Sequence, residues 1–295
     1  MNIIKSILFP GLFCAIALAA CEKQLDTDKV NFEVTTNKTT YKVGDTVIFK
    51  FAGNPDNITF FSGEEGYKYE FRSRIKATGK PQFQFTSYAQ FGVQTNTLQV
   101  LASTDFSGIV DQNIVNGGWK DITNLTTLST GTDNTASGVV DLTQFIGDKP
   151  LYLAYHFVGQ AGTTQRTWTI KNFSVQNKLN DGPLVSVADQ ITAGFTQISL
   201  KNPSAVWVIA ADNIKITGGN TTSLENDDWV VSKPLYLDKV SPDVGVALKN
   251  ITTKMTSYPY IFTKAGTYKI TFLATNATVN KSESVVKELT ITVEP

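Results

Sequence analysis

The chain has 295 residues, of which 41% are hydrophobic and 18% charged, and its 26 basic residues balance 26 acidic ones. This balance, without any lysine- or arginine-rich block, argues against a nucleic-acid-binding or polybasic membrane surface. The length is enough for two or three small domains. Both cysteines lie within the first 21 residues, so the rest of the chain can form neither a disulfide nor a cysteine-based metal site.

The first 20 residues have the pattern of a secretion signal. Lys5 gives the start a positive charge, residues 7–17 are mostly apolar, and small residues precede Cys21. The apolar run is shorter than the roughly 20 residues that a membrane-spanning helix needs. The sequence LAAC at 18–21 resembles the lipobox of bacterial lipoproteins, whose cysteine is acylated before the signal is removed. The resemblance implies a signal peptide over 1–20 and a lipid anchor on Cys21; the alternative is an ordinary signal with an incidental cysteine.

Residues 21–29 are polar and charged and show no periodicity, which predicts a flexible tether. The acidic residues soon after Cys21 resemble the export signal of surface-exposed Bacteroidetes lipoproteins. That resemblance implies display on the outer membrane, facing the cell exterior. A solvated spacer without a sorting role is the alternative.

The remaining chain is predicted to be all-β. It is rich in Thr, Val, Ile, Phe and Tyr, it has Gly, Asn and Asp at turn-like intervals, and it shows almost no helical periodicity. At both ends, apolar residues alternate with polar ones, as in half-buried strands. The predicted inward positions are Val47, Phe49, Phe51, Tyr268, Ile270, Phe272, Leu289, Ile291 and Val293.

Two terminal motifs resemble a known domain type. YKVGDTVIF at 41–49 and AGTYKITFLATN at 265–276 resemble the opening and closing strands of PKD-type immunoglobulin-like domains. Strand-like segments between 98 and 175 follow the order seen in jelly rolls of the cleaved-adhesin type. The whole mature chain resembles a family of Bacteroidetes surface lipoproteins with a domain of unknown function. The resemblance implies a multi-domain β-sandwich protein, Ig/PKD-like at its ends with a jelly-roll centre, behind a lipoprotein signal peptide.

We expect three consecutive segments in the body: a PKD/Ig-like region over 30–75, a jelly-roll β-sandwich over 76–178, and a C-terminal β-sandwich with PKD-like last strands over 179–295. The first is short for a sandwich of roughly 100 residues. Either it is truncated, or the C-terminal segment supplies its missing strands and the jelly roll is inserted between them. The polar segment 177–182, followed by Pro183, is the best linker candidate.

Catalytic motifs are scarce. His156 is the single histidine, so two-histidine zinc motifs are excluded and a Ser-His-Asp triad could use only this imidazole. The sequence has no G-x-S-x-G elbow, phosphate loop, dinucleotide fingerprint or EF-hand loop. The densest acidic pairs are 64–65 and 227–228, but adjacent carboxylates on a strand point to opposite faces. We therefore expect a protein that is not an enzyme.

The apolar run 151–158 predicts a strand that carries candidate binding residues. If its odd-numbered residues face the core, alternation puts Tyr152, Ala154 and His156 on the outer or concave surface. Sugar binding needs an exposed aromatic face together with amide or charged groups. The candidate ligand-binding residues are therefore Tyr152 and His156, with Arg166 nearby.

Residues 168–175 predict a strand with a bulge. Trp168 and Ile170 have one parity and Phe173 and Val175 the other, so a bulge near Asn172 would return all four to the core. We expect Trp168 to be structural, like the other three tryptophans.

Asp105 and Asn172 occupy places that hold a structural calcium in some similar jelly rolls, which makes them candidate calcium ligands. Calcium needs six or more oxygen ligands, so these two residues alone do not define a site. The alternative is a pair of turn or bulge residues without a metal. No other cofactor is expected.

Members of the resembled family commonly sit beside glycan-import machinery. The expected function is therefore that of an outer-membrane surface lipoprotein that binds a glycan, without catalysis, as an accessory of a polysaccharide uptake system. The expected partners are the membrane, through the lipid, a polysaccharide or oligosaccharide, and an outer-membrane importer, but no nucleic acid. The first alternative is an adhesin or structural protein that binds protein or host matrix, and the second is a glycoside hydrolase accessory.

Overall fold

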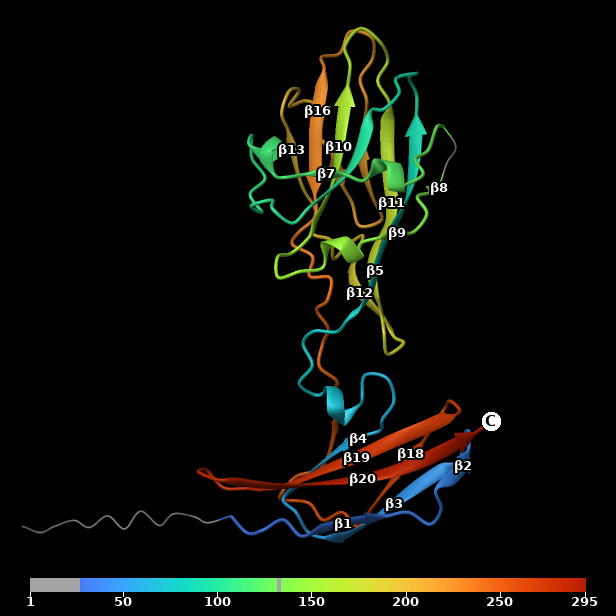
Figure 1. Cartoon of the computed structure of the whole chain (residues 1–295), viewed down its shortest axis with the longest axis vertical. Coiled ribbons are helices and arrows are strands. Elements are labelled where there is room, and N and C mark those ends of the chain that lie inside the picture. The colour runs from blue at the N-terminus through green and yellow to red at the C-terminus, as the bar shows by residue number, and fades with distance from the viewer. Residues whose placement is uncertain (1–26, 132–133) are drawn as a thin grey trace, which may run out of the picture. The chain divides into compact units, whose positions relative to one another are not determined.

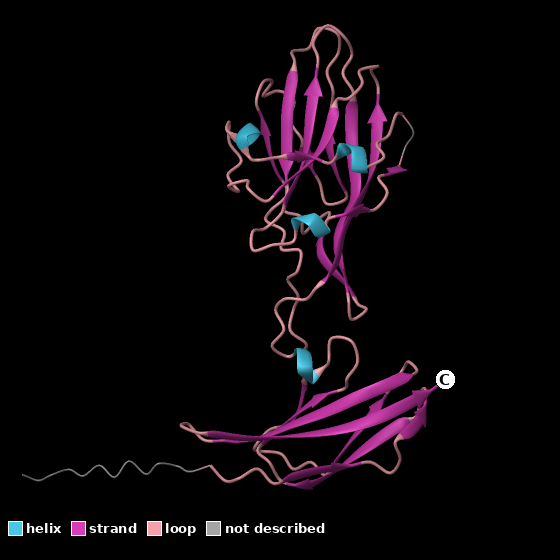
Figure 2. Ribbon diagram, viewed as in Figure 1, coloured by secondary structure: helices cyan, strands magenta, loops and turns pink. Residues whose placement is uncertain are grey.

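The computed structural model describes residues 27–131 and 134–295, which form strands joined by turns and short 3₁₀ helices (Figures 1 and 2). The predicted all-β class is confirmed. In the described part of the chain, no helix is long and apolar enough to cross a membrane. The expected signal peptide, Cys21 and tether residues up to 26 lie outside the described residues. The 3₁₀ helices are η1 (Tyr69–Phe71), η2 (Ile114–Asn116), η3 (Thr123–Leu125) and η4 (Thr143–Phe145).

The described end of the expected tether contacts the fold. The Thr27 hydroxyl donates to the Lys281 carbonyl at 3.2 Å, and the Asn276 amide donates to the Asp28 carbonyl at 3.1 Å. Residues 27 and 28 are therefore held by hydrogen bonds to the C-terminal part of the chain, unlike the flexible tether expected there.

The described chain forms two compact units. The split unit consists of the described residues up to Tyr69 together with Val244–Pro295, and the central unit is Glu70–Asp243. This division differs from the three consecutive segments expected from the sequence, because residues 179–295 do not form a sandwich of their own. The C-terminal segment supplies strands to the short first region, and the central unit is inserted between them, which confirms the second of the two alternatives that the sequence left open.

The split unit contains a three-stranded and a five-stranded sheet. Their strand orders are β1-β3-β18 and β17-β4-β19-β20-β2. Because β18 pairs with β3 and β19 pairs with β4, both sheets combine strands from before and after the insertion. The strands are β1 (Phe32–Thr35), β2 (Thr40–Lys42), β3 (Thr46–Gly53), β4 (Asn57–Phe61), β17 (Val246–Lys249), β18 (Ser257–Ile261), β19 (Gly266–Ala277) and β20 (Ser282–Glu294).

The split unit has an aromatic core that confirms the predicted alternation. The rings of Phe49 and Phe272 lie 5.2 Å apart, and Phe60 packs 5.1 Å from Phe272. All nine predicted inward residues belong to this core or pack against it; Phe51, Tyr268 and Leu289 are only half-buried.

The central unit contains a five-stranded sheet of order β13-β16-β10-β6-β7. A larger sheet has the order β14-β15-β11-β5-β8, with β12 pairing to β11 and β9 to β5. One core cluster takes buried side chains from both sheets, as in a β-sandwich. The strands are β5 (Gly79–Gln90), β6 (Leu98–Ser103), β7 (Lys120–Asp121), β8 (Thr135–Ala136), β9 (Val140–Asp141), β10 (Tyr152–Gly159), β11 (Thr167–Leu179), β12 (Leu184–Asp189), β13 (Thr196–Ser199), β14 (Val208–Ile209), β15 (Asn213–Ile216) and β16 (Asn226–Val231).

Strand β11 contains the predicted bulge. Its register against β5 shifts between Lys171 and Ser174, and Asn172 has a φ of 53°, in the left-handed region. The shift brings the two parities of the strand to one face, so that four predicted residues enter the core: Trp168, Ile170, Phe173 and Val175.

The segment proposed as a linker is a hairpin turn. Strand β11 ends at Leu179, and β12 returns along it from Leu184. Gly182 in the turn has a φ of 112°, which an L side chain rarely adopts. The boundary expected at 178 therefore falls inside a strand of the central unit.

Candidate functional site

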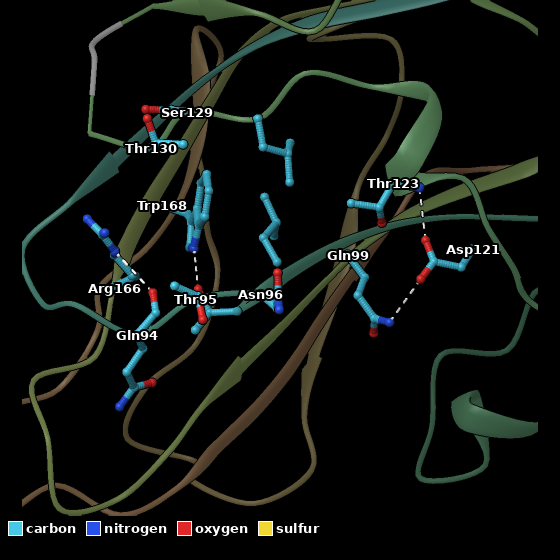
Figure 3. A pocket seen from close by; sticks show the side chains of 13 residues that line it. Gln94, Thr95, Asn96, Gln99, Asp121, Thr123, Ser129, Thr130, Arg166 and Trp168 are labelled. Carbon is cyan, nitrogen blue, oxygen red and sulfur yellow. Dashed lines mark hydrogen bonds between the residues drawn. The ribbon is translucent and has the colours of Figure 1, made fainter.

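The candidate site is a polar cavity of about 440 Å³ in the central unit (Figure 3). It is lined by the β5–β6 connection, the first residues of β6, the ends of β7 and η3 that face each other, residues 128–130, Arg166 just before β11, and Trp168 within β11. Three amides line it: Gln94, Asn96 and Gln99. Five hydroxyls line it: Thr95, Thr97, Thr123, Ser129 and Thr130. The other lining residues are Leu98, Leu128, Asp121, Arg166 and Trp168.

Arg166, predicted as a binding residue, lies in this cavity. Its Nε donates to the Gln94 carbonyl at 3.2 Å (Figure 3). The Gln94 side chain is itself held by the β10–β11 loop, since its amide nitrogen donates to Gln160 O at 2.8 Å and to Thr163 Oγ1 at 2.7 Å. Within the described part of the chain, Arg166 has no other hydrogen bond or ion pair. Its two terminal guanidinium nitrogens are therefore available to a ligand.

Trp168 lies on the buried side of the cavity. Its Nε1 donates to the Thr97 hydroxyl at 2.9 Å, and its ring belongs to the central core. Trp168 is therefore structural, as the sequence predicts. One wall of the cavity is thus held by the sandwich core, while much of the remaining lining comes from the β5–β6 connection and residues 128–130.

Asp121 is the acidic residue among the described lining residues. Its Oδ1 accepts from the Thr123 backbone N–H at 2.8 Å, and its Oδ2 accepts from the Gln99 amide at 3.1 Å. Burial raises the pKa of Asp121, but the hydrogen bonds from Thr123 and Gln99 outweigh it and hold the pKa below its ordinary value. The group is an ionised, hydrogen-bonded carboxylate at neutral pH and is poorly suited to act as a general acid.

His156 lies beside the cavity and is already fully engaged. Its Nδ1 lies 2.9 Å from Gln99 Oε1, and its Nε2 lies 2.8 Å from Asp227 Oδ1. Burial lowers the pKa of His156 more than the Asp227 carboxylate raises it. Both ring nitrogens face acceptor oxygens, so a neutral ring can donate to only one of them. The structure thus places His156 in a bridging role between strands.

Tyr152 does not face solvent, contrary to the expectation that it lies on a binding surface. Its residue exposure is 8%, and its ring meets that of Phe106 edge-on at 5.1 Å. The predicted alternation of β10 is correct, because its odd-numbered residues are in the central core. Its even-numbered face, however, is covered by the β6–β7 connection, which contributes Phe106 and Ile114 to a second apolar cluster. Tyr152 therefore packs inside the protein.

The other tryptophans are also structural. Trp207 belongs to the central core and Trp229 to the second cluster. Trp119 is half-buried against that cluster, and its Nε1 donates to the Ile114 carbonyl at 2.7 Å. None of these rings is a free platform for a sugar.

The two candidate calcium ligands lie on different sheets. Asp105 follows β6 and forms an exposed ion pair with Lys149 at 2.8 Å. Asn172 lies in the β11 bulge, where its amide donates to Thr86 Oγ1 at 3.3 Å. Among the residues that the structure describes, no three His, Cys, Asp or Glu side chains are grouped to hold a metal ion.

Asp227 and Asp228 point to opposite faces of β16, as the sequence predicts. Asp228 is 0% exposed, and both of its carboxylate oxygens are buried without a hydrogen-bond partner in the described structure. Burial raises the pKa of Asp228 to about 7, and the nearby Asp227 charge adds to the increase. A glycosidase pair is not formed here, because the two carboxylates do not face one cleft.

Sequence reasoning missed most of the cavity. Its amide and hydroxyl groups come from separate segments, and only the polar run 94–97 between two strands was available as a loop signal. Such a run predicts a connection, but nothing in it indicates that residues 121–130 fold beside it.

The fold and this site define an all-β protein of two units whose central unit carries a polar cavity. A family model, "Domain of unknown function (DUF5017)", matches residues 20–195, and the protein belongs to this family. The match ends just before β13, so part of the central unit and the C-terminal strands of the split unit lie beyond it. No curated protein and no solved structure matches the chain.

Proposed function

We propose that the protein is a lipid-anchored, outer-membrane glycan-binding protein that acts, without catalysis, as an accessory of polysaccharide uptake. The observation that carries the proposal is the cavity, in which amides, hydroxyls and one guanidinium converge over a core-supported wall. Sugar hydroxyls both donate and accept hydrogen bonds, so they suit such a mixed lining. The volume of about 440 Å³ is within the usual range of small-molecule sites.

The lining contains both fixed and free polar groups. Gln94 and Gln99 are held by internal hydrogen bonds. Asn96 and Thr95 are exposed, and Asn96 adopts a left-handed φ of 54°. We propose that these two residues and Arg166 contact the glycan, because the side-chain polar groups of Thr95 and Asn96 and the terminal guanidinium nitrogens of Arg166 are not committed to the fold.

The same lining argues for binding without hydrolysis. Glycosidases place two carboxyl groups roughly 5 to 10 Å apart across the scissile bond. The described lining contains one carboxylate, Asp121, and both of its oxygens already accept hydrogen bonds. A single carboxylate in this state supplies neither a general acid nor a nucleophile–acid pair.

The membrane location is proposed from the N-terminal sequence. The signal-like residues 1–20 and the lipobox-like LAAC lead directly to Cys21. Two or more acyl chains on this cysteine would hold the protein stably at a membrane, since each buried methylene contributes about 0.8 kcal/mol.

Affinity gel electrophoresis against a panel of neutral and acidic polysaccharides tests the binding proposal. Each polymer that retards the protein is then titrated by calorimetry into the wild type and into Arg166→Ala. Lys178→Ala is the control, since Lys178 is exposed at the far end of β11. We expect Arg166→Ala to weaken binding at least about tenfold and Lys178→Ala to leave it unchanged. The proposal would be contradicted if no polymer retarded the protein, or if the protein bound only immobilised matrix proteins. Shorter sugars appearing in the same samples would contradict the absence of catalysis.

A further inference from the structure

We infer that the ligand of this cavity is an acidic glycan, whose uronate carboxylate pairs with Arg166 and whose sugar ring stacks on Phe91. The inference rests on the proposed glycan-binding function. It adds the charge of the ligand and an aromatic contact that lies outside the lining described above.

Phe91 is an exposed ring on a strained backbone. The residue follows β5 directly, is 69% exposed, and has a φ of 53°. A bulky side chain in the left-handed region is a conformational outlier. Burial of the ring does not compensate for the strain, because most of the ring is in solvent. Strained residues of this kind concentrate at binding sites, where they hold a side chain in a functional position.

The strand register places Phe91 at the Arg166 end of the cavity. Gln90 pairs with Thr167 at the end of the β5–β11 ladder. Phe91, which follows Gln90, and Arg166, which precedes Thr167, therefore come next to each other just beyond the ladder. The turn is tightly packed there: a Cβ on Gly92 would lie 2.2 Å from the Thr164 carbonyl oxygen. Gln94, which accepts the Arg166 hydrogen bond, is three residues beyond Phe91.

The charges of the cavity favour an anionic ligand group at this end. Arg166 is the single basic residue among the described lining residues. Its Nε is engaged by Gln94, which fixes the plane of the guanidinium and leaves the two terminal nitrogens to donate. A planar guanidinium binds a carboxylate through two parallel hydrogen bonds. Asp121 does not neutralise Arg166 by a direct ion pair, because its oxygens accept from Gln99 and Thr123.

A uronic acid sugar combines the two features that this end of the cavity requires. Its carboxylate matches Arg166, and the apolar face of its ring matches an exposed aromatic side chain. In the described central unit, the exposed aromatic residues are Phe91 and Tyr236, and Tyr236 lines a different cavity. Tyr236 is therefore a matched control.

Polygalacturonate, its fully methyl-esterified form and alginate are the probes. We expect both acidic polymers to retard wild type in affinity gels, and esterification to weaken binding of polygalacturonate at least tenfold. Arg166→Gln should abolish the difference between the acid and ester forms. Phe91→Ala should weaken binding about tenfold, Phe91→Trp should retain it, and Tyr236→Ala should have no effect.

Phe91→Gly separates binding from folding. Glycine tolerates the left-handed backbone, so this variant should melt at the wild-type temperature or above it while losing the same affinity as Phe91→Ala. Equal binding of the acid and ester forms, or retention by neutral polymers only, would overturn the acidic ligand and leave the proposed glycan binding intact. Unchanged affinity in both Phe91 variants would overturn the stacking contact. Failure to bind any polysaccharide, neutral or acidic, would overturn the proposed function as well.

Discussion

His156 and Trp229 stack on neighbouring strands β10 and β16, with ring centroids 4.1 Å apart and planes inclined by 19°. One carboxylate oxygen joins the two rings, because Asp227 Oδ1 lies 2.8 Å from His156 Nε2 and accepts from Trp229 Nε1 at 3.1 Å. The polar atoms of both rings are thereby committed to the fold. This face of the sheet stabilises the central unit and does not present a free binding surface.

Replacing the histidine should therefore affect stability more than binding. His156→Ala removes the stacking contact with Trp229 and the partly buried hydrogen bond that the neutral imidazole donates, so the central unit should lose about 1–3 kcal/mol of unfolding free energy. Affinity for a glycan that binds the wild-type protein should change less than about twofold. Urea unfolding and calorimetric titration measure the two effects. Unchanged stability together with lost binding would show that His156 contacts the ligand.

The core of the split unit depends on its phenylalanines. Phe49→Ala or Phe272→Ala should lower the unfolding free energy of this unit by about 3–5 kcal/mol, because each ring is fully buried among aromatic neighbours. Ile48→Ala, at an exposed position on the same strand, should change it by less than about 0.5 kcal/mol. Denaturant titration followed by a probe placed in each unit measures the change in the split unit and checks that the central unit is unaffected. An equal loss for Ile48 and Phe49 would mean that the assignment of faces is wrong.

Asp228 should make stability depend on pH. Its pKa is raised in the folded state from 3.8 to about 7, mainly by burial. The folded state therefore binds the carboxyl proton of Asp228 more tightly than the unfolded state does. The stability that this protonation contributes is complete below pH 3.8 and is lost as the pH rises towards about 7. Asp228→Asn removes this dependence. Its stability relative to wild type should increase between pH 4 and 7, by up to about 1.4 kcal/mol per pH unit.

A matched acid should show the opposite sign. Hydrogen bonds from Thr143 lower the pKa of Asp141, so its contribution is present above the ordinary pKa and is lost as the pH falls. Asp141→Asn should therefore be destabilised relative to wild type at neutral pH. Thermal melts of both variants from pH 4 to 8 check the two directions. Parallel curves for wild type and Asp228→Asn would show that this carboxyl group does not titrate in the expected range.

The anchor is tested at Cys21. If this cysteine carries the lipid, Cys21→Ala should leave an unprocessed precursor or release the protein from the membrane fraction. Metabolic labelling with a fatty-acid analogue should mark wild type and not the variant. Equal labelling of both proteins would place the lipid elsewhere.

Local patterns in the sequence predicted the strands well, since alternation depends only on neighbouring residues. The inward positions around Phe49 and Phe272 and the bulge at Asn172 follow from side-chain parity alone. The DUF5017 membership also agrees with the resemblance to a family with a domain of unknown function. Nothing local indicated that β18 returns to β3, because that pairing depends on the tertiary fold.

The candidate site was predictable only in part. Arg166 lies in the cavity, but Tyr152 is covered by a segment that begins after Ser103. Parity predicts which face of a strand a residue occupies, but it does not predict what a distant connection places over that face. For the same physical reason, the convergence of residues 94–99 with residues 121–130 could not be derived from spacing.

The central claim is that the polar cavity binds a glycan. Hydrogen–deuterium exchange on the wild-type protein, with and without a saturating concentration of a polysaccharide that it binds, tests this claim most directly. If the polar cavity binds the glycan, amide exchange should slow in residues 92–97 and 128–130, and the split unit should be unaffected. Protection confined to the split unit, or unchanged exchange around the cavity at saturation, would contradict the account.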